Sequence, residues 1–151
     1  MSYLVFLVLN FGALALGALL MGEGPLGAWY QSLDKAPWTP PGWVFGFTWT
    51  SIMLCYAIYM GRIWKAFTAS RKEVALLFLV QWILNVSWNP VFFHFHWMGL
   101  GMFVILSLEL ILIIKHIKFF NRSVLSHLLI APYILWLVIA FSLNEYAWWY
   151  A

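Results

Sequence analysis

Residues 29–49 read WYQSLDKAPWTPPGWVFGFTW, a stretch with four tryptophans and three prolines that ends in an apolar run. Tryptophan is enriched at membrane interfaces and in ligand-binding walls, where most of the ring is apolar and the N–H needs a partner. Proline holds such a segment in a restricted, extended geometry. The stretch therefore predicts a preorganised aromatic loop that leads into a membrane helix and covers a binding site.

Composition indicates a membrane protein around this loop. The chain has 151 residues, of which 65% are hydrophobic and 9% are charged, whereas soluble domains have roughly 25% charged residues. Too little polar surface is available for a soluble globule, so we expect one integral membrane domain over residues 1–151. The single cysteine, Cys55, excludes an internal disulfide.

Charged residues divide the chain into five apolar segments, each near the ~20 residues that a membrane-spanning helix needs. The expected helices cover about residues 3–21, 43–60, 74–93, 98–114 and 124–143. A membrane β-barrel would instead show alternating segments of ~10 residues. We therefore predict an all-α membrane protein, a five-helix bundle with a long aromatic loop at 23–41. The first segment lacks a basic start and a cleavage pattern, so we expect a retained helix rather than a signal peptide.

Lys and Arg residues predict the orientation. The connectors 62–72 and 115–122 carry four and three of them, and the opposite side carries only Lys35. Because cytoplasmic loops are enriched in Lys and Arg, the N-terminus is expected in the cytoplasm. This pattern favours the cell membrane, with an outer membrane as the alternative. Contact with the lipid bilayer accounts for the net charge of +3, which gives no case for nucleic acid.

Three amide side chains follow one face of the third predicted helix. Gln81, Asn85 and Asn89 are spaced by four residues, which places them on one stripe. Amides facing lipid are unfavourable, so the stripe should face the bundle interior. Two interpretations remain open: hydrogen bonds between helices, or polar anchors within a mostly apolar pocket.

Aromatic stripes on two further helices point to a cavity for a flat ligand. The fifth predicted helix carries Pro132, Tyr133, Trp136, Ala140 and Asn144, and the second carries Phe45, Trp49, Met53 and Tyr56. Such stripes usually reflect packing. Two of them place an indole near the aromatic loop, and indoles both stack on planar rings and donate a hydrogen bond.

These motifs together resemble the tryptophan-rich sensory protein or translocator protein family, also called the peripheral benzodiazepine receptor family, and a bacterial member of it. The 29–49 stretch is similar to the family signature WY-x-x-L-x-K-P-x-W-x-P-P, with Ala36 as one inserted residue. Asn85 to Phe93 resembles the family's third-helix pattern, and PYILWLVIAFSLN at 132–144 resembles its fifth-helix pattern.

The resemblance implies a five-helix bundle, usually a homodimer, that binds tetrapyrroles such as protoporphyrin IX or haem-type molecules. It also implies binding of benzodiazepine and isoquinoline-type ligands. No cofactor is required and no metal site is expected. The ligand-binding residues carried over by the resemblance, together with the indole beside the amide stripe, are Tyr30, Pro40, Phe45, Trp49, Asn85, Trp88, Trp136 and Ala140.

Three functions are open from the sequence. The first is a tetrapyrrole-binding receptor or transporter. The second is a light- and oxygen-dependent porphyrin-degrading enzyme, for which the resemblance implies Trp49 and Trp136 as catalytic residues. The third is a structural or regulatory membrane partner. The sequence shows no nucleophile–base pair, P-loop or metal cage for hydrolytic chemistry.

Three remaining features carry weaker functional signals. A carboxylate within an apolar segment, as at Glu109, should be protonated, paired or directed inward, and we favour packing or a dimer contact over proton transfer. His94 and His96 form a pair that we interpret as interfacial, since two imidazoles alone make a poor zinc site. Cholesterol binding is doubtful because no Lys or Arg follows Tyr146.

Overall fold

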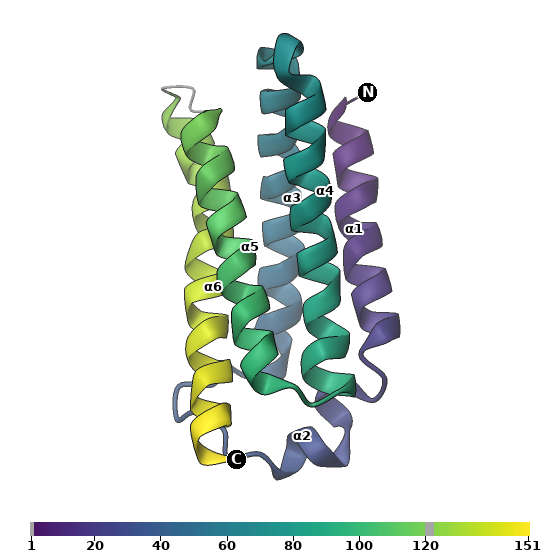
Figure 1. The fold of residues 1–151 in the computed structure, drawn as a ribbon, viewed down its shortest axis with the longest axis vertical. Coiled ribbons are helices and arrows are strands. Elements are labelled where there is room, and N and C mark those ends of the chain that lie inside the picture. The colour runs from purple at the N-terminus through teal and green to yellow at the C-terminus, as the bar shows by residue number, and fades with distance from the viewer. Residues whose placement is uncertain (1, 120–122) are drawn as a thin grey trace.

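The structure, a computed structural model, describes residues 2–119 and 123–151. Five long helices run along the bundle, and a sixth, short helix lies across one end (Figure 1). The elements are α1 (Ser2–Leu20), η1 (Gly24–Leu26), α2 (Ala28–Ser32), α3 (Gly42–Ala66), η2 (Thr68–Ser70), α4 (Arg71–Asn89), the π-helical turn η3 (Pro90–His94), α5 (Met98–Lys118) and α6 (Val124–Tyr150).

All five long helices are long and apolar enough to cross a membrane. The predicted all-α, five-helix membrane protein is therefore confirmed. The N-terminus and the C-terminus lie at opposite ends of the bundle, as an odd number of spans requires (Figure 1).

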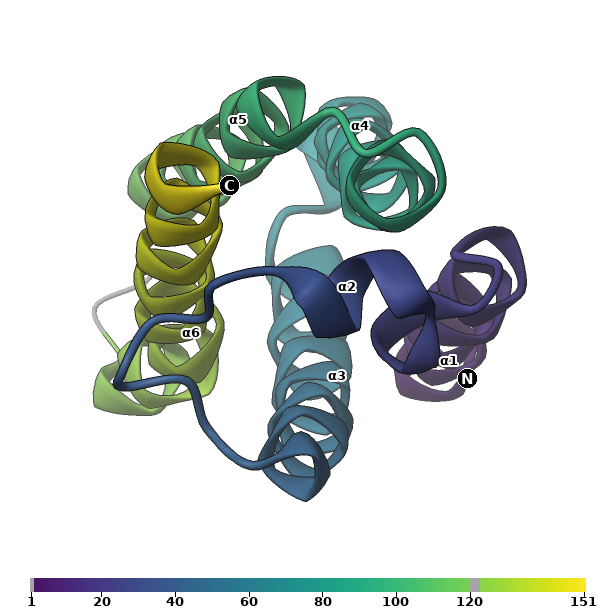
Figure 2. The same ribbon diagram turned by 90° about the horizontal axis from the view of Figure 1, so that it is seen from below.

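The five long helices form a closed ring rather than a sequential row. Neighbouring pairs are α1 with α3, α3 with α6, α6 with α5, α5 with α4, and α4 with α1. Figure 2, which looks along the bundle, shows this order and shows α2 crossing the end of the ring. The segment after η1 thus forms a lid over the bundle end, as the aromatic loop predicts.

Several predicted boundaries are wrong. The second helix does not end near Met60 but continues to Ala66, and the last does not end near Leu143 but continues to Tyr150. The predicted segments ended at the first charged or polar residues after each apolar run. In α3, Arg62 and Lys65 can remain in the helix at the membrane surface because their long apolar stems extend the charge into water. The third helix ends at Asn89, and the π-helical turn follows from Pro90.

The segment between the first two spans is also more ordered than the predicted loop. It contains η1 and the five-residue α2, which precede an extended stretch up to Pro41. Gly22 and Gly24 have φ values of 65° and 54°, which glycine adopts without the strain of a side chain. These two glycines turn the chain away from α1 and back across the bundle end.

Glycines permit close helix contacts with α1. A Cβ at Gly17 would lie 2.5 Å from Nδ2 of Asn89 on α4, and a Cβ at Gly61 on α3 would overlap the ring of Tyr3. Larger residues at either position would separate the helices. The small residues of the first span therefore allow close packing, as their distribution predicts.

The end of the bundle away from the lid has a packed core. Tyr56, Tyr59 and Leu112 are almost completely buried there. Lys115 is also fully buried, with its ammonium against the Tyr56 hydroxyl. Sequence reasoning counted Lys115 among the connector charges, and this placement is wrong. Arg122, counted in the same connector, lies outside the described residues.

Candidate functional site

A cavity of about 530 Å³ lies within the helix ring beneath the lid. Its size falls in the roughly 300–1,000 Å³ range of small-molecule sites, and its lining is mostly apolar. The structure brings all eight predicted ligand-binding residues to this one cavity. They are Tyr30, Pro40, Phe45, Trp49, Asn85, Trp88, Trp136 and Ala140. Their role in binding stays a prediction.

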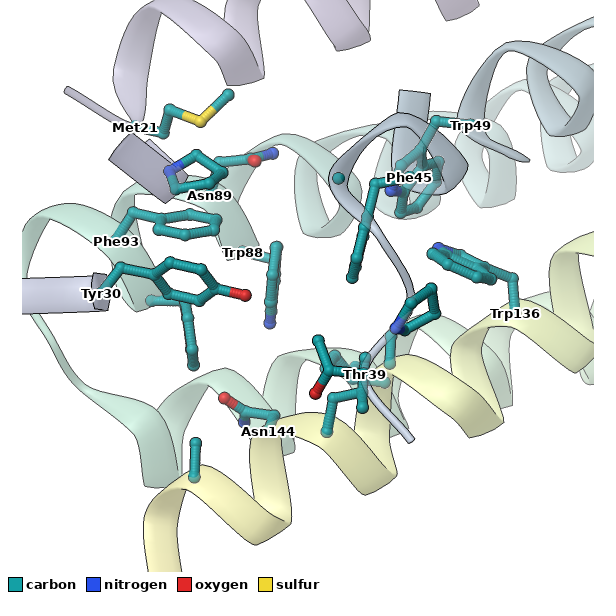
Figure 3. Close-up of a pocket in the computed structure, with 18 of the residues that line it drawn as sticks. Met21, Tyr30, Thr39, Phe45, Trp49, Trp88, Asn89, Phe93, Trp136 and Asn144 are labelled. Carbon is teal, nitrogen blue, oxygen red and sulfur yellow. The ribbon is translucent and has the colours of Figure 1, made fainter. Parts of the chain in front are cut away.

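Aromatic rings from α3 and α6 form one part of the cavity wall. Phe45 on α3 meets Trp136 on α6 edge-to-face, with ring centroids 5.3 Å apart. Trp49 packs in the same way against Tyr133, at 5.8 Å. Figure 3 shows Phe45, Trp49 and Trp136 grouped on one side of the cavity, across from Trp88. Rings held edge-to-face are fixed by their neighbours, which leaves preorganised surfaces for a flat ligand.

The amides of the α4 stripe differ in their surroundings: one makes a hydrogen bond between helices, and the others line the cavity. The amide of Gln81 donates to the Tyr133 hydroxyl at 3.0 Å and joins α4 to α6. Asn85, only 7% exposed, lines the cavity, and its side chain makes no hydrogen bond within the described part of the chain. Asn89 also lines the cavity. Gln81 is therefore a packing residue, whereas Asn85 presents unused donors and an acceptor to the cavity.

A second polar group lies where α4, α5 and α6 meet. Asn144 donates through Nδ2 to the Met98 carbonyl at 2.9 Å, which fixes the orientation of its amide. The Oδ1 atom of Asn144 and the indole N–H of Trp88 are both buried without a partner among the described residues. Both atoms lie within 3.6 Å of the position that a Cβ on Gly101 would occupy. A glycine here therefore gives the two polar side chains room.

Contacts at both ends hold the lid over the cavity. At the α2 end, Trp29 stacks on His96 with centroids 3.9 Å apart, and Tyr30 contacts Phe93 at 5.3 Å. At the other end, the Trp38 indole donates to the Ser142 hydroxyl at 3.2 Å. The lid is thus attached to η3 and its flank on one side and to α6 on the other.

The hydroxyl of the lid residue Tyr30 points toward Trp88 (Figure 3). Burial raises the pKa of this hydroxyl above its ordinary value. A tyrosine with a raised pKa stays protonated at neutral pH, so Tyr30 offers the cavity an uncharged hydrogen-bond donor.

Sequence comparison identifies the family. The sequence profile of the TspO/MBR family matches residues 4–150. The chain belongs to the TspO/MBR family. The chain is 33% identical to protein CrtK of Rhodobacter capsulatus over 126 residues, which cover 81% of this chain and 78% of CrtK. It is 29% identical to the tryptophan-rich sensory protein of Cereibacter sphaeroides, over 94% of this chain and 86% of that protein. It is 30% identical to human translocator protein, over 84% of this chain and 76% of that protein.

This TspO/MBR protein also uses residues that sequence reasoning did not select for the site. The additional lining residues are polar groups of the lid and of α4 and α6, and small or apolar residues of α1: Lys35, Thr39, Asn89, Asn144, Ala13 and Leu14. Asn89 and Asn144 already lay on the two predicted stripes, and that spacing was a usable signal. The part played by α1 had no such signal because its apolar residues surround the helix without a distinct face.

In the histidine pair of this TspO/MBR protein, His96 is the member that packs against a lid ring. His96 stacks on Trp29 and has a positive φ of 59°, while His94 and His96 both border a smaller hollow of about 220 Å³. Within residues 2–119 and 123–151, no three His, Cys, Asp or Glu side chains are close enough together to hold a metal ion.

Proposed function

We propose that this TspO/MBR protein is a receptor or transporter-like membrane protein that binds tetrapyrroles, such as protoporphyrin IX or haem-type molecules, beneath the lid. The same cavity would accept benzodiazepine and isoquinoline-type ligands. The observation that carries this proposal is the Asn85 amide, which is buried, has no hydrogen-bond partner among the described residues, and lies in a cavity walled by indoles. Buried polar groups are usually hydrogen-bonded, so an unused amide facing a cavity favours a ligand there.

The shape and chemistry of the wall support a flat, mostly apolar ligand. Trp49 and Trp136 come from different helices and line the same cavity. Indoles gain from stacking on planar rings and from burying large apolar areas. Tetrapyrroles and fused aromatic drug-like molecules share this chemistry.

Titration with protoporphyrin IX in the dark tests the proposal. Detergent-purified protein is titrated while porphyrin absorbance and tryptophan fluorescence are both followed. We expect saturable binding that Trp136→Ala weakens at least tenfold, because a buried aromatic anchor is typically worth about 2 kcal/mol or more. Trp149→Ala, at a side chain that is 69% exposed, is the matched control. Non-saturable binding, or equal weakening by both substitutions, would contradict the proposal.

The membrane arrangement is part of the proposal. The basic connectors would face the cytoplasm together with the N-terminus, and the lid would face the opposite side of the cell membrane. We also propose a homodimer. Accessibility of single cysteines placed in the lid or in the 68–70 connector, in a Cys55→Ala background, tests the orientation in intact cells. Labelling of the connector but not of the lid by a membrane-impermeant reagent would contradict it.

A second candidate function is light-dependent degradation of the bound porphyrin. Its basis is the position of Trp49 and Trp136 in one cavity, each fixed by an edge-to-face ring contact. Light would excite the porphyrin, and molecular oxygen would be the oxidant. We expect illumination to consume protein-bound porphyrin faster than free porphyrin, and Trp49→Phe to remove the excess. Equal loss of bound and free porphyrin would leave binding as the sole function.

A further inference from the structure

The lid supplies one cation to a cavity that is otherwise neutral. Of the lysines and arginines in residues 2–119 and 123–151, only Lys35 is part of the cavity lining. Lys35 is half-buried, and it precedes the buried Ala36 in the extended stretch of the lid. A positive charge at the edge of an apolar cavity would attract an opposite charge on whatever enters.

The ammonium of Lys35 has unused hydrogen-bonding capacity. Its Nζ donates to the Gln31 carbonyl at 3.4 Å, a long bond, and lies 4.9 Å from the centroid of the Tyr30 ring. Among the described residues the one ion pair joins Lys118 to Glu73 at the other end of the bundle. An ammonium group carries three donors, so Lys35 can still donate to an anion.

Two further lid residues with hydroxyl groups, Tyr30 and Thr39, also line the cavity. The Tyr30 hydroxyl points into the cavity, and Thr39 lies apart from it in the lining (Figure 3). Both can donate a hydrogen bond to a carboxylate. The lid therefore presents a cation with two hydroxyls, whereas the α3 and α6 walls present Phe45, Trp49 and Trp136.

From this division we propose that Lys35 is a specificity-determining residue that selects ligands bearing a carboxylate. The carboxylate would lie under the lid at Lys35, and the flat ring would extend inward between the indoles. This proposal rests on the proposed function, and it adds the charge and the orientation of the ligand.

Nearby carboxylates do not oppose this assignment. Three carboxylates lie at the lid end of the bundle: Glu23, Asp34 and Glu145. All three are exposed, and none of them lines the cavity. Exposed charges are strongly screened at physiological ionic strength, whereas a partly buried contact is screened much less. Contact with Lys35 should therefore outweigh the more distant repulsion.

The test compares protoporphyrin IX with its dimethyl ester, which keeps the ring and lacks both negative charges. Full-length protein in a non-ionic detergent is titrated with each compound in the dark. We expect wild-type protein to bind the acid about fivefold to tenfold more tightly than the ester, the range for a partly exposed ion pair with charge-assisted hydrogen bonds. Lys35→Met should reduce this ratio to about one while it leaves binding of the ester unchanged. Lys35→Arg should restore the preference.

The matched control is Lys65→Met, which removes an exposed lysine from the other end of the bundle and should leave the ratio unchanged. Equal binding of acid and ester by wild-type protein would overturn the assignment, and so would an unchanged ratio in Lys35→Met. If Lys35→Met and Lys35→Gln both abolished binding of the acid and of the ester, Lys35 would be a lid-packing residue. That result would also overturn the assignment. If neither compound binds wild-type protein saturably, the proposed function itself fails.

Discussion

Several buried polar groups have different surroundings at the two ends of the bundle, although Ser2 Oγ and Arg62 Nε, at the end away from the lid, also lack a partner among the described residues. At the end away from the lid, the Tyr59 hydroxyl contacts Nδ1 of His116 at 3.0 Å, and Lys115 contacts Tyr56. Under the lid, the Asn85 amide lines the cavity and makes no hydrogen bond within the described residues. The Oδ1 atom of Asn144 is buried there without a partner among the same residues. Polar groups paired within the protein stabilise the fold, whereas unpaired ones around a cavity can be satisfied by a ligand. Under the proposed function, the paired groups serve stability and the unpaired amides around the cavity serve binding.

Truncating the packed end should have the largest effect on stability. Leu112 is fully buried and does not line the cavity. Leu112→Ala should lower the free energy of unfolding by about 2–5 kcal/mol, because the lost methyl groups leave a void. Thermal unfolding in detergent measures this. Leu110→Ala, on the same helix but 57% exposed, is the control and should have little effect. Similar losses in both variants would show that this end is not tightly packed.

Two amides one helical turn apart give the sharpest form of the comparison. Gln81→Leu should lower the free energy of unfolding by about 1–3 kcal/mol, because the buried Tyr133 hydroxyl loses its partner. It should change porphyrin affinity little. Asn85→Leu should leave stability unchanged or raised and should weaken porphyrin binding about fivefold, by loss of one hydrogen bond. Thermal unfolding and dark titration of both variants measure the two effects. The division between the ends would be refuted if each variant changed both quantities alike.

A smaller effect is expected at the lid. Trp38→Phe removes the hydrogen bond from the indole to Ser142 and keeps an aromatic ring near Tyr146. The loss of about 0.5–1.5 kcal/mol from lid attachment should raise the rate of porphyrin dissociation by a few-fold. Stopped-flow displacement measures this rate. Trp43→Phe, at a side chain that is 72% exposed, serves as control. An unchanged rate would show that the Trp38 end of the lid does not limit release.

The predicted site and the observed cavity agree because most lining residues lie on helices with regular spacing. The stripes Gln81–Asn85–Asn89 and Tyr133–Trp136–Ala140–Asn144 each place their members on one helix face. Spacing could not decide which amide would be paired. Nε2 of Gln81 is paired because α6 carries Tyr133 at the same depth, whereas its Oε1 is buried without a partner among the described residues. One turn further along, the helices surround a cavity, and Asn85 has no such neighbour.

The lid residues were harder to predict because no periodicity governs an irregular segment. Tyr30 and Pro40 entered the predicted site through family resemblance, whereas Lys35 and Thr39 were not selected. Their place in the cavity lining depends on how the chain crosses the bundle end, and contacts at a distance in sequence fix that path. The contacts are those of Trp29 with His96 and of Trp38 with Ser142.

The sequence by itself determined the membrane class, the five spans and the faces that the amide and aromatic stripes present, because hydropathy and helical periodicity are local properties. Only the tertiary structure decided the ring order of the helices and the burial of Lys115, which sequence reasoning had placed in a connector. It also decided which polar groups are paired and which face the cavity. Each of these outcomes depends on residues far apart in the chain lying at the same depth in the helix bundle. No local sequence pattern predicts that depth.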